Sequence, residues 1–102
     1  NASYRQNLRS ERAARTQLTA AISGRPARGM VNRLIAHGEA AGSPQVAGYP
    51  MAYDAAKQLH VAASQLGNHE FAAQWAGQGA PLAREMPAAE LVELLVREWR
   101  QD

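Results

Sequence analysis

The segment PAAELVELLVREW, residues 87–99, carries the clearest structural signal in the chain. Proline suits the first turn of a helix, and the apolar residues that follow it recur at helical spacing. Glu90 and Glu93 come early in the segment and Arg97 comes late, which suits the dipole of a helix. We therefore predict a helix that begins at Pro87, with an apolar patch formed by Leu91, Val92, Leu94, Leu95, Val96 and Trp99.

Proline and glycine punctuation predicts four more helices on the N-terminal side of this segment. Proline favours the start of a helix, and glycine suits the left-handed residue that closes one. Together with capping-box spacing from Ser3 to Gln6, these signals predict helices at residues 3–22, 26–41 and 50–66, and a short one that Asn68 caps and Gly77 ends. No strand signal stands out. The expected fold is all-α, with about five helices in a single helical unit over residues 1–102.

The composition indicates a thin hydrophobic core. A chain of 102 residues has room for one small domain. Its apolar content includes 22 alanines, and only 17 residues are Leu, Ile, Val or Phe. Disordered chains combine few large apolar residues with strong self-repulsion, and a net charge of +2 does not supply that repulsion. We therefore expect an alanine-rich folded protein.

Several classes of protein and site are excluded by composition. The chain has no cysteine, so it cannot form a disulfide, a thiolate metal site or a thiol nucleophile. No run approaches the roughly 18 apolar residues of a membrane span. The three histidines share no i, i+3 or i+4 spacing, so we expect no metal site at His37, His60 and His69. A cysteine-free chain without a secretory signal suits a cytoplasmic location.

Charge is divided unevenly along the chain. Residues 1–34 hold seven arginines and one glutamate, whereas the remainder holds eight acidic residues against four basic ones. A basic first third could contact nucleic acid. The favoured interpretation is that its arginines form a solvated face or attract the acidic half. We expect no nucleic-acid partner, because the acidic half would repel a phosphate backbone.

Tyr49, Tyr53 and Lys57 form a candidate substrate-binding set. Tyr53 and Lys57 are four residues apart on a predicted helix and are therefore neighbours on its surface. A tyrosine beside a lysine can bind an anion or a nitro-type group. The same pair is also typical of the ordinary edge of an amphipathic helix, and the spacing leaves both interpretations open.

Two motifs in order resemble the nitronate monooxygenase family, formerly called 2-nitropropane dioxygenases. The first is SGRPARG at residues 23–29, followed by Asn-Arg at 32–33. The second is WAGQG at residues 75–79, followed by Leu-Ala-Arg at 82–84 and PAAELV at 87–92. Their order and spacing resemble the C-terminal region of that family, and the likeness extends over nearly the whole chain.

The resemblance implies a fold and an activity for the complete enzyme. Members are FMN-dependent TIM-barrel oxidoreductases that oxidise alkyl nitronates with molecular oxygen. Residues 1–70 then resemble the helical segment on the substrate side, and residues 71–102 resemble the C-terminal return to the barrel. The resemblance implies that the stretch nearest the cofactor includes Trp75, Gly77, Gln78 and Gly79. From the residues alone, Gly77-Gln78-Gly79 is either a helix terminator or a place where backbone approaches a ligand.

The length of the chain limits what the resemblance implies. A TIM barrel needs about 250 residues and eight strands. The family's phosphate-binding segment and catalytic histidine lie upstream of the resembling region, so no catalytic residue is predicted. We expect a C-terminal fragment that neither binds FMN tightly nor turns over nitronate by itself. The alternative is a freestanding helical interaction module, for example a homodimer, that buries residues 91–99 against a partner. A nucleic-acid binder is the weakest alternative.

Overall fold

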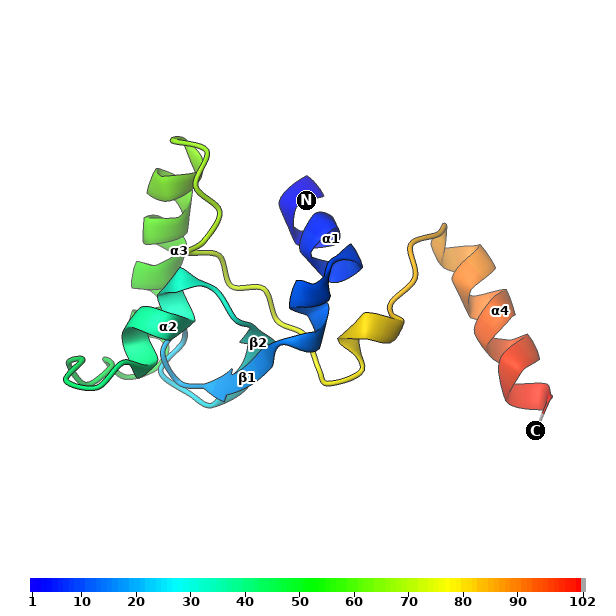
Figure 1. Cartoon of the computed structure of the whole chain (residues 1–102), viewed down its shortest axis with the longest axis horizontal. Coiled ribbons are helices and arrows are strands. Elements are labelled where there is room, and N and C mark those ends of the chain that lie inside the picture. Colours follow the sequence, from blue (N-terminus) through cyan, green and yellow to red (C-terminus); the bar gives the residue numbers. More distant parts are fainter. Residues whose placement is uncertain (102) are drawn as a thin grey trace.

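A small sheet and a set of short helices make up the fold (Figure 1). The computed structural model describes residues 1–101. Within that range the elements follow in the order α1 (Ala2–Arg9), η1 (Glu11–Ala14), β1 (Thr16–Thr19), β2 (Ala27–Met30), α2 (Arg33–Glu39), α3 (Met51–Ser64), η2 (Ala80–Leu82) and α4 (Ala88–Arg100), where η marks a 3₁₀ helix. The predicted all-α fold with about five helices is wrong, because β1 and β2 pair as an antiparallel sheet.

The helix predicted at residues 3–22 ends early because Ser10 competes for its backbone groups. The Ser10 hydroxyl donates to the carbonyl of Asn7 at 2.8 Å and accepts from the amide of Arg12 at 3.1 Å. Ser10 is thereby the last cap of α1 and the first cap of η1. Local side-chain bonds of this kind offer the backbone an alternative to continuing a helix. The chain then extends into β1, where two β-branched threonines suit a strand.

The helix predicted at residues 26–41 begins late because its first part pairs as a strand. Residues 27–30 form β2, which pairs with β1 and also meets a distant segment through a bridge between Gly29 and Trp75. The amide of Met30 donates to the carbonyl of Gln74 at 2.9 Å, and that of Ala76 donates to the carbonyl of Arg28 at 3.1 Å. Residues 72–76 form an extended segment that reaches β2 at Gln74–Ala76, and the short helix expected from Asn68 to Gly77 is absent within residues 1–101.

Asn32 starts α2 and joins it to that extended segment. Its Oδ1 accepts from the amide of Ile35 at 3.1 Å, and its Nδ2 donates to the carbonyl of Ala72 at 2.8 Å. The side chain is buried, so both bonds form away from water. One asparagine thus caps a helix and fixes a segment that lies 40 residues further along the chain.

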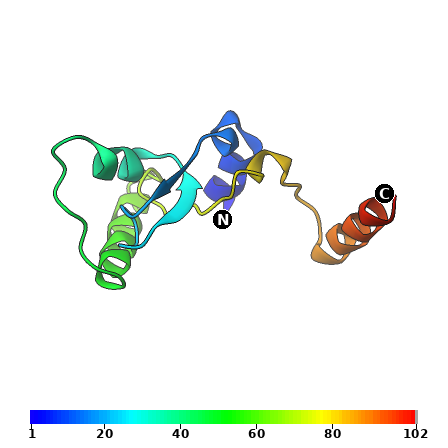
Figure 2. The same ribbon diagram turned by 90° about the horizontal axis from the view of Figure 1, so that it is seen from below.

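The two remaining helix predictions are confirmed. The helix predicted at residues 50–66 is α3, and the helix predicted from Pro87 is α4. Both Figure 1 and Figure 2 show α4 standing apart from the other elements, joined to them by the segment after η2. The molecule is accordingly elongated, with extents of 50 × 29 × 25 Å.

The thin core expected from composition is confirmed. The buried apolar side chains are those of Ala13, Ile22, Met30, Ile35 and Ala72. They lie in or next to the sheet, η1, α2 and the extended segment. In residues 1–101 no helix has both the length and the apolar character that crossing a membrane requires.

Candidate functional site

The structure brings the three predicted substrate-side residues to one groove. Tyr49 lies just before α3, and Tyr53 and Lys57 follow on successive turns of that helix. The Nζ of Lys57 lies 4.4 Å from the centroid of the Tyr53 ring. A groove of about 520 Å³ runs along them, lined by Tyr49, Pro50, Met51, Tyr53, Asp54 and Lys57.

Trp75 connects this groove to the second sequence motif. Its ring meets Tyr53 edge-on, with centroids 6.2 Å apart and planes at 62°. The indole Nε1–H donates to the Tyr53 hydroxyl at 3.4 Å. Trp75 was predicted on the cofactor side and Tyr53 on the substrate side, so the structure places one residue from each set in contact. Aromatic pairs of this geometry restrict the orientation of both rings.

Tyr4 is a member of this cluster that sequence reasoning missed. Its hydroxyl donates to the carbonyl of Trp75, a residue 71 positions away. Burial raises the pKa of the Tyr4 phenol above its ordinary value, and Tyr53 raises it further. No local pattern marks Tyr4, because its partners come from the other end of the chain.

A second cavity of about 210 Å³ lies between α1, α3 and the extended segment. Tyr4, Tyr53, Lys57 and Gln74 line it, so Tyr53 and Lys57 border both cavities. Gln74 is buried, and its Oε1 accepts from the Nδ2 of Asn7 on α1 at 2.7 Å. Gln74 was also missed from the sequence, since its role depends on where α1 lies.

His60 completes the wall of that second cavity. Its Nδ1 is buried and finds no hydrogen-bond partner within residues 1–101. Its ring lies 6.4 Å from that of His69, centroid to centroid. Within the same part of the chain, no three His, Asp or Glu side chains gather in a way that could hold a metal ion.

The predicted cofactor-side stretch beyond Trp75 lies at an open edge. Gly77, Gln78 and Gly79 are exposed. A Cβ built on either glycine would meet nothing within 4 Å among the described residues. The side chain of Gln78 makes no hydrogen bond in residues 1–101. The stretch can therefore accept a group from outside the chain, but it does not by itself enclose a pocket.

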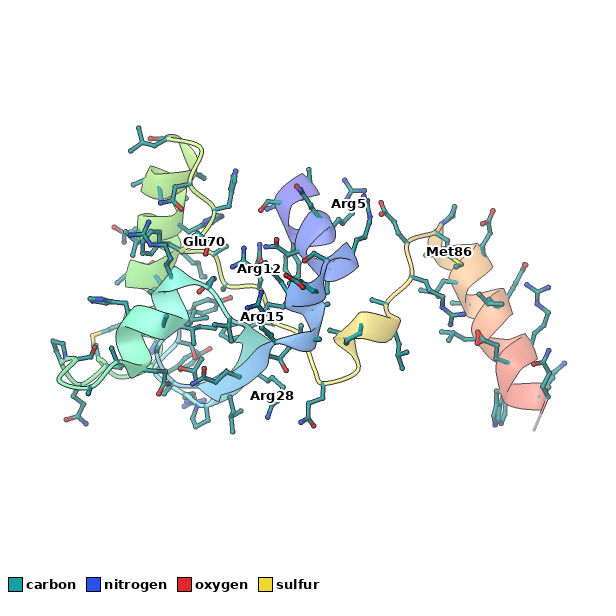
Figure 3. All side chains as sticks on the ribbon, in the orientation of Figure 1. Arg5, Arg12, Arg15, Arg28, Glu70 and Met86 are labelled. Atoms are coloured by element: carbon teal, nitrogen blue, oxygen red, sulfur yellow. The ribbon has the colours of Figure 1, made fainter. Side chains whose placement is uncertain are left out.

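Two groups of ion pairs join the N-terminal third of the chain to later segments. Arg12 donates two hydrogen bonds to the Glu70 carboxylate, from Nη1 to Oε2 at 2.8 Å and from Nη2 to Oε1 at 3.0 Å (Figure 3). Its Nη2 also donates to the carbonyl of Val31 at 3.1 Å. The bond from Arg12 holds the pKa of Glu70 below its ordinary value. Arg5 and Arg9 on α1 contact Glu85. These contacts confirm the interpretation that arginines of the first third attract acidic residues of the second half.

Proteins similar to this chain are named for nitronates and nitroalkanes. The family model described as nitronate monooxygenase matches residues 1–98. A nitronate monooxygenase of Pseudomonas aeruginosa is 58% identical over 100 residues, which cover 98% of this chain and 28% of that protein. A nitronate monooxygenase of Paraburkholderia phytofirmans is 54% identical over 98 residues, covering 96% of this chain and 27% of that protein.

A solved structure agrees with these sequence matches. The nitroalkane oxidase of Streptomyces ansochromogenes is similar with a TM-score of 0.80 and 39% identity, covering 96% of this chain and 28% of that one. The groove along α3, with its two tyrosines, Lys57 and Asp54, thus belongs to a fold shared with a nitroalkane oxidase. The chain belongs to the nitronate monooxygenase family. It spans a little over a quarter of the length of the relatives that it matches.

Proposed function

We propose that the chain is the C-terminal, substrate-side section of an FMN-dependent nitronate monooxygenase, which oxidises alkyl nitronates with molecular oxygen. The observation that carries the proposal is that Tyr53, which lines the groove, contacts both Lys57 and Trp75. The family match and the share of the relatives that the chain covers support it.

The groove suits an alkyl nitronate because it combines a cation with aromatic walls. A nitronate carries negative charge on its oxygens, and the ammonium of Lys57 lies where it can attract them. The phenol of Tyr53 accepts from the Trp75 indole and can donate its own proton to a nitronate oxygen. The rings of Tyr49 and Tyr53 offer apolar surface to the alkyl chain. Lys57 is exposed in this chain. Its attraction for the nitronate oxygens would strengthen in a complete enzyme in which further protein excludes water from the groove.

Trp75, Gly77, Gln78 and Gly79 would face the flavin in the complete enzyme. FMN would supply the redox chemistry between nitronate and oxygen. The open space at both glycines would let the cofactor approach the backbone closely, and the free amide of Gln78 could hydrogen-bond to it. Because Trp75 also contacts Tyr53, the same residue would orient the substrate-side phenol.

A chimeric enzyme tests the proposal. Residues 1–98, the span of the family match, would replace the corresponding stretch of the Pseudomonas aeruginosa nitronate monooxygenase, which is 58% identical to this chain over 100 residues. We expect the purified chimera to retain flavin and to consume oxygen with an alkyl nitronate. A chimera that folds and holds flavin but consumes no oxygen would contradict the proposed function.

Lys57→Gln in the chimera tests the role of the cation. Removing a charged hydrogen-bond partner of the substrate should raise KM by about tenfold or more. The control is Arg97→Gln, which removes an exposed positive charge from α4, and it should leave KM unchanged. Equal effects of the two substitutions would show that Lys57 contributes only general charge.

The alternative function is a helical interaction module, and one observation favours it. Val92, Leu95 and Trp99 of α4 are all exposed, with 75% of the Trp99 surface accessible. In a freestanding protein this face would associate with a second copy. We also propose a cytoplasmic location, which cell fractionation would test.

A further inference from the structure

The loop before Tyr49 rests directly on the backbone of Gly24. Gly24 has a φ of +89°, a conformation that favours glycine. A Cβ at this position would lie 2.6 Å from the carbonyl oxygen of Ala47 and 2.7 Å from the amide nitrogen of Tyr49. The loop can therefore sit where it does only because Gly24 has no side chain.

Arg25, the next residue, holds the side chain of Tyr49. Its guanidinium carbon lies 4.3 Å from the centroid of the Tyr49 ring. The buried hydroxyl of Ser23 donates to the carbonyl of Arg25 at 3.1 Å and accepts from its amide at 3.3 Å, which fixes the backbone beneath the guanidinium. Arg25 forms no ion pair with another residue in 1–101, so the ring is its principal contact in this range.

The groove is thus bordered by two stacked pairs. Lys57 lies over Tyr53 and Arg25 lies over Tyr49, so each ring carries a cation on one face. Tyr53 is further restrained by Trp75, whereas Tyr49 stands on a loop and is 46% exposed. Arg25 is therefore the contact that can keep the Tyr49 ring in one orientation.

We propose that Arg25 is a positioning residue of the substrate groove, which fixes the Tyr49 ring so that it forms a preorganised wall. The proposal rests on the proposed function of the groove. Arg25 acts through Tyr49 and need not touch the substrate. Its loss should weaken binding of the ground state and transition state alike, which raises KM and leaves kcat in place.

The kinetic test uses Arg25→Gln in the chimera described above. Because the substitution removes a cation–aromatic contact at an exposed site, we expect KM for an alkyl nitronate to rise about two- to fivefold while kcat is unchanged. The matched control is Arg33→Gln, since Arg33 is also exposed and stacks on an aromatic ring, that of Phe71 at 5.3 Å, outside the groove. The control should leave KM unchanged. A fall in kcat alone, or no effect of Arg25→Gln, would overturn the proposal.

Nuclear magnetic resonance of the 102-residue chain tests the stacking without turnover. Ring currents of Tyr49 should shift the side-chain proton resonances of Arg25, and Tyr49→Leu should return them to ordinary positions. Unshifted Arg25 resonances in the unsubstituted chain would overturn the proposal. If Arg25→Gln has no effect in an active chimera, the positioning role fails alone. If an otherwise intact chimera is inactive while the shifts persist, the proposed function fails and the groove role falls with it.

Discussion

Glu70 shows how one residue joins distant parts of this chain. Its carboxylate accepts two hydrogen bonds from Arg12, and the pair joins η1 to the turn that precedes the extended segment. Both side chains are about a third exposed, so the pair is only partly shielded from solvent. The contact lowers the pKa of Glu70 in the folded state, and the acid form is therefore less compatible with the fold.

This lowered pKa predicts a pH dependence of stability. The contribution of ionised Glu70 to the free energy of unfolding is complete above its unfolded-state pKa of about 4.5. This contribution is lost as pH falls through the lower folded-state pKa. Glu70→Gln should cost about 1 kcal/mol at neutral pH, because a charged hydrogen bond is lost at a partly exposed site. Urea unfolding monitored between pH 7 and pH 3 should show a weaker acid dependence in this variant. Parallel pH profiles would contradict the assignment.

Gly24 offers a second prediction at the residue scale. Gly24→Ala combines a positive φ with a clash against the backbone at 2.6 Å, so the free energy of unfolding should fall by at least about 1–3 kcal/mol. Gly67→Ala is the matched control, because Gly67 also has a positive φ but its Cβ would meet nothing within 4 Å. Thermal unfolding should show a smaller loss of stability for Gly67→Ala than for Gly24→Ala. Equal losses would show that the loop moves to relieve the clash at position 24.

At the scale of elements, α3 and α4 were predictable and the sheet was not. Helical spacing and proline starts are local signals, so the two helices near residues 50–66 and 87–99 follow from the sequence. The pairing of β1 with β2 is not local in the same sense. It is supported by hydrogen bonds that join the other edge of β2 to Gln74 and Ala76. The sequence around residues 27–30 does not indicate these distant partners. Tertiary hydrogen bonds here override the helical signals at Pro26.

The exposed face of α4 gives a prediction at this scale. Val92, Leu95 and Trp99 lie on one side of the helix, so the chain should self-associate through that side. Leu95→Glu should shift the sedimentation coefficient toward that of a monomer. Arg97→Glu introduces a glutamate on the opposite side and should leave association unchanged. A monomeric unsubstituted chain at the same concentration would contradict the prediction.

At the scale of the whole molecule, the chain presents parts of a site and not an enclosed one. Trp75 contacts Tyr53 of the groove along α3, whereas Gly77-Gln78-Gly79 opens outward. We predict that the 102-residue chain does not retain added FMN. After gel filtration, the protein fraction should show no flavin absorbance. The chimera is the positive control, since it should retain flavin through the same separation. A stoichiometric yellow complex of the 102-residue chain would contradict this.

The candidate site was predictable in part for the same reason as the helices. Tyr53 and Lys57 are adjacent because of helical spacing, and the WAGQG motif marked Trp75 through a resemblance. Tyr4 and Gln74 were missed, since they join the cluster only when α1 folds back over the extended segment. No pattern in the residues next to Tyr4 or Gln74 predicts that contact.

The sequence by itself determined the small core, the helices α3 and α4, the family, and the spacing of Tyr53 and Lys57. These depend on composition and on contacts between residues a few positions apart. Only the tertiary structure decided the sheet, the place of Tyr4 and Gln74, and the seat of Tyr49 on Gly24 and Arg25. Each of these requires backbone or side-chain groups from distant segments to satisfy one another, and local preference does not encode which distant partner a group will find.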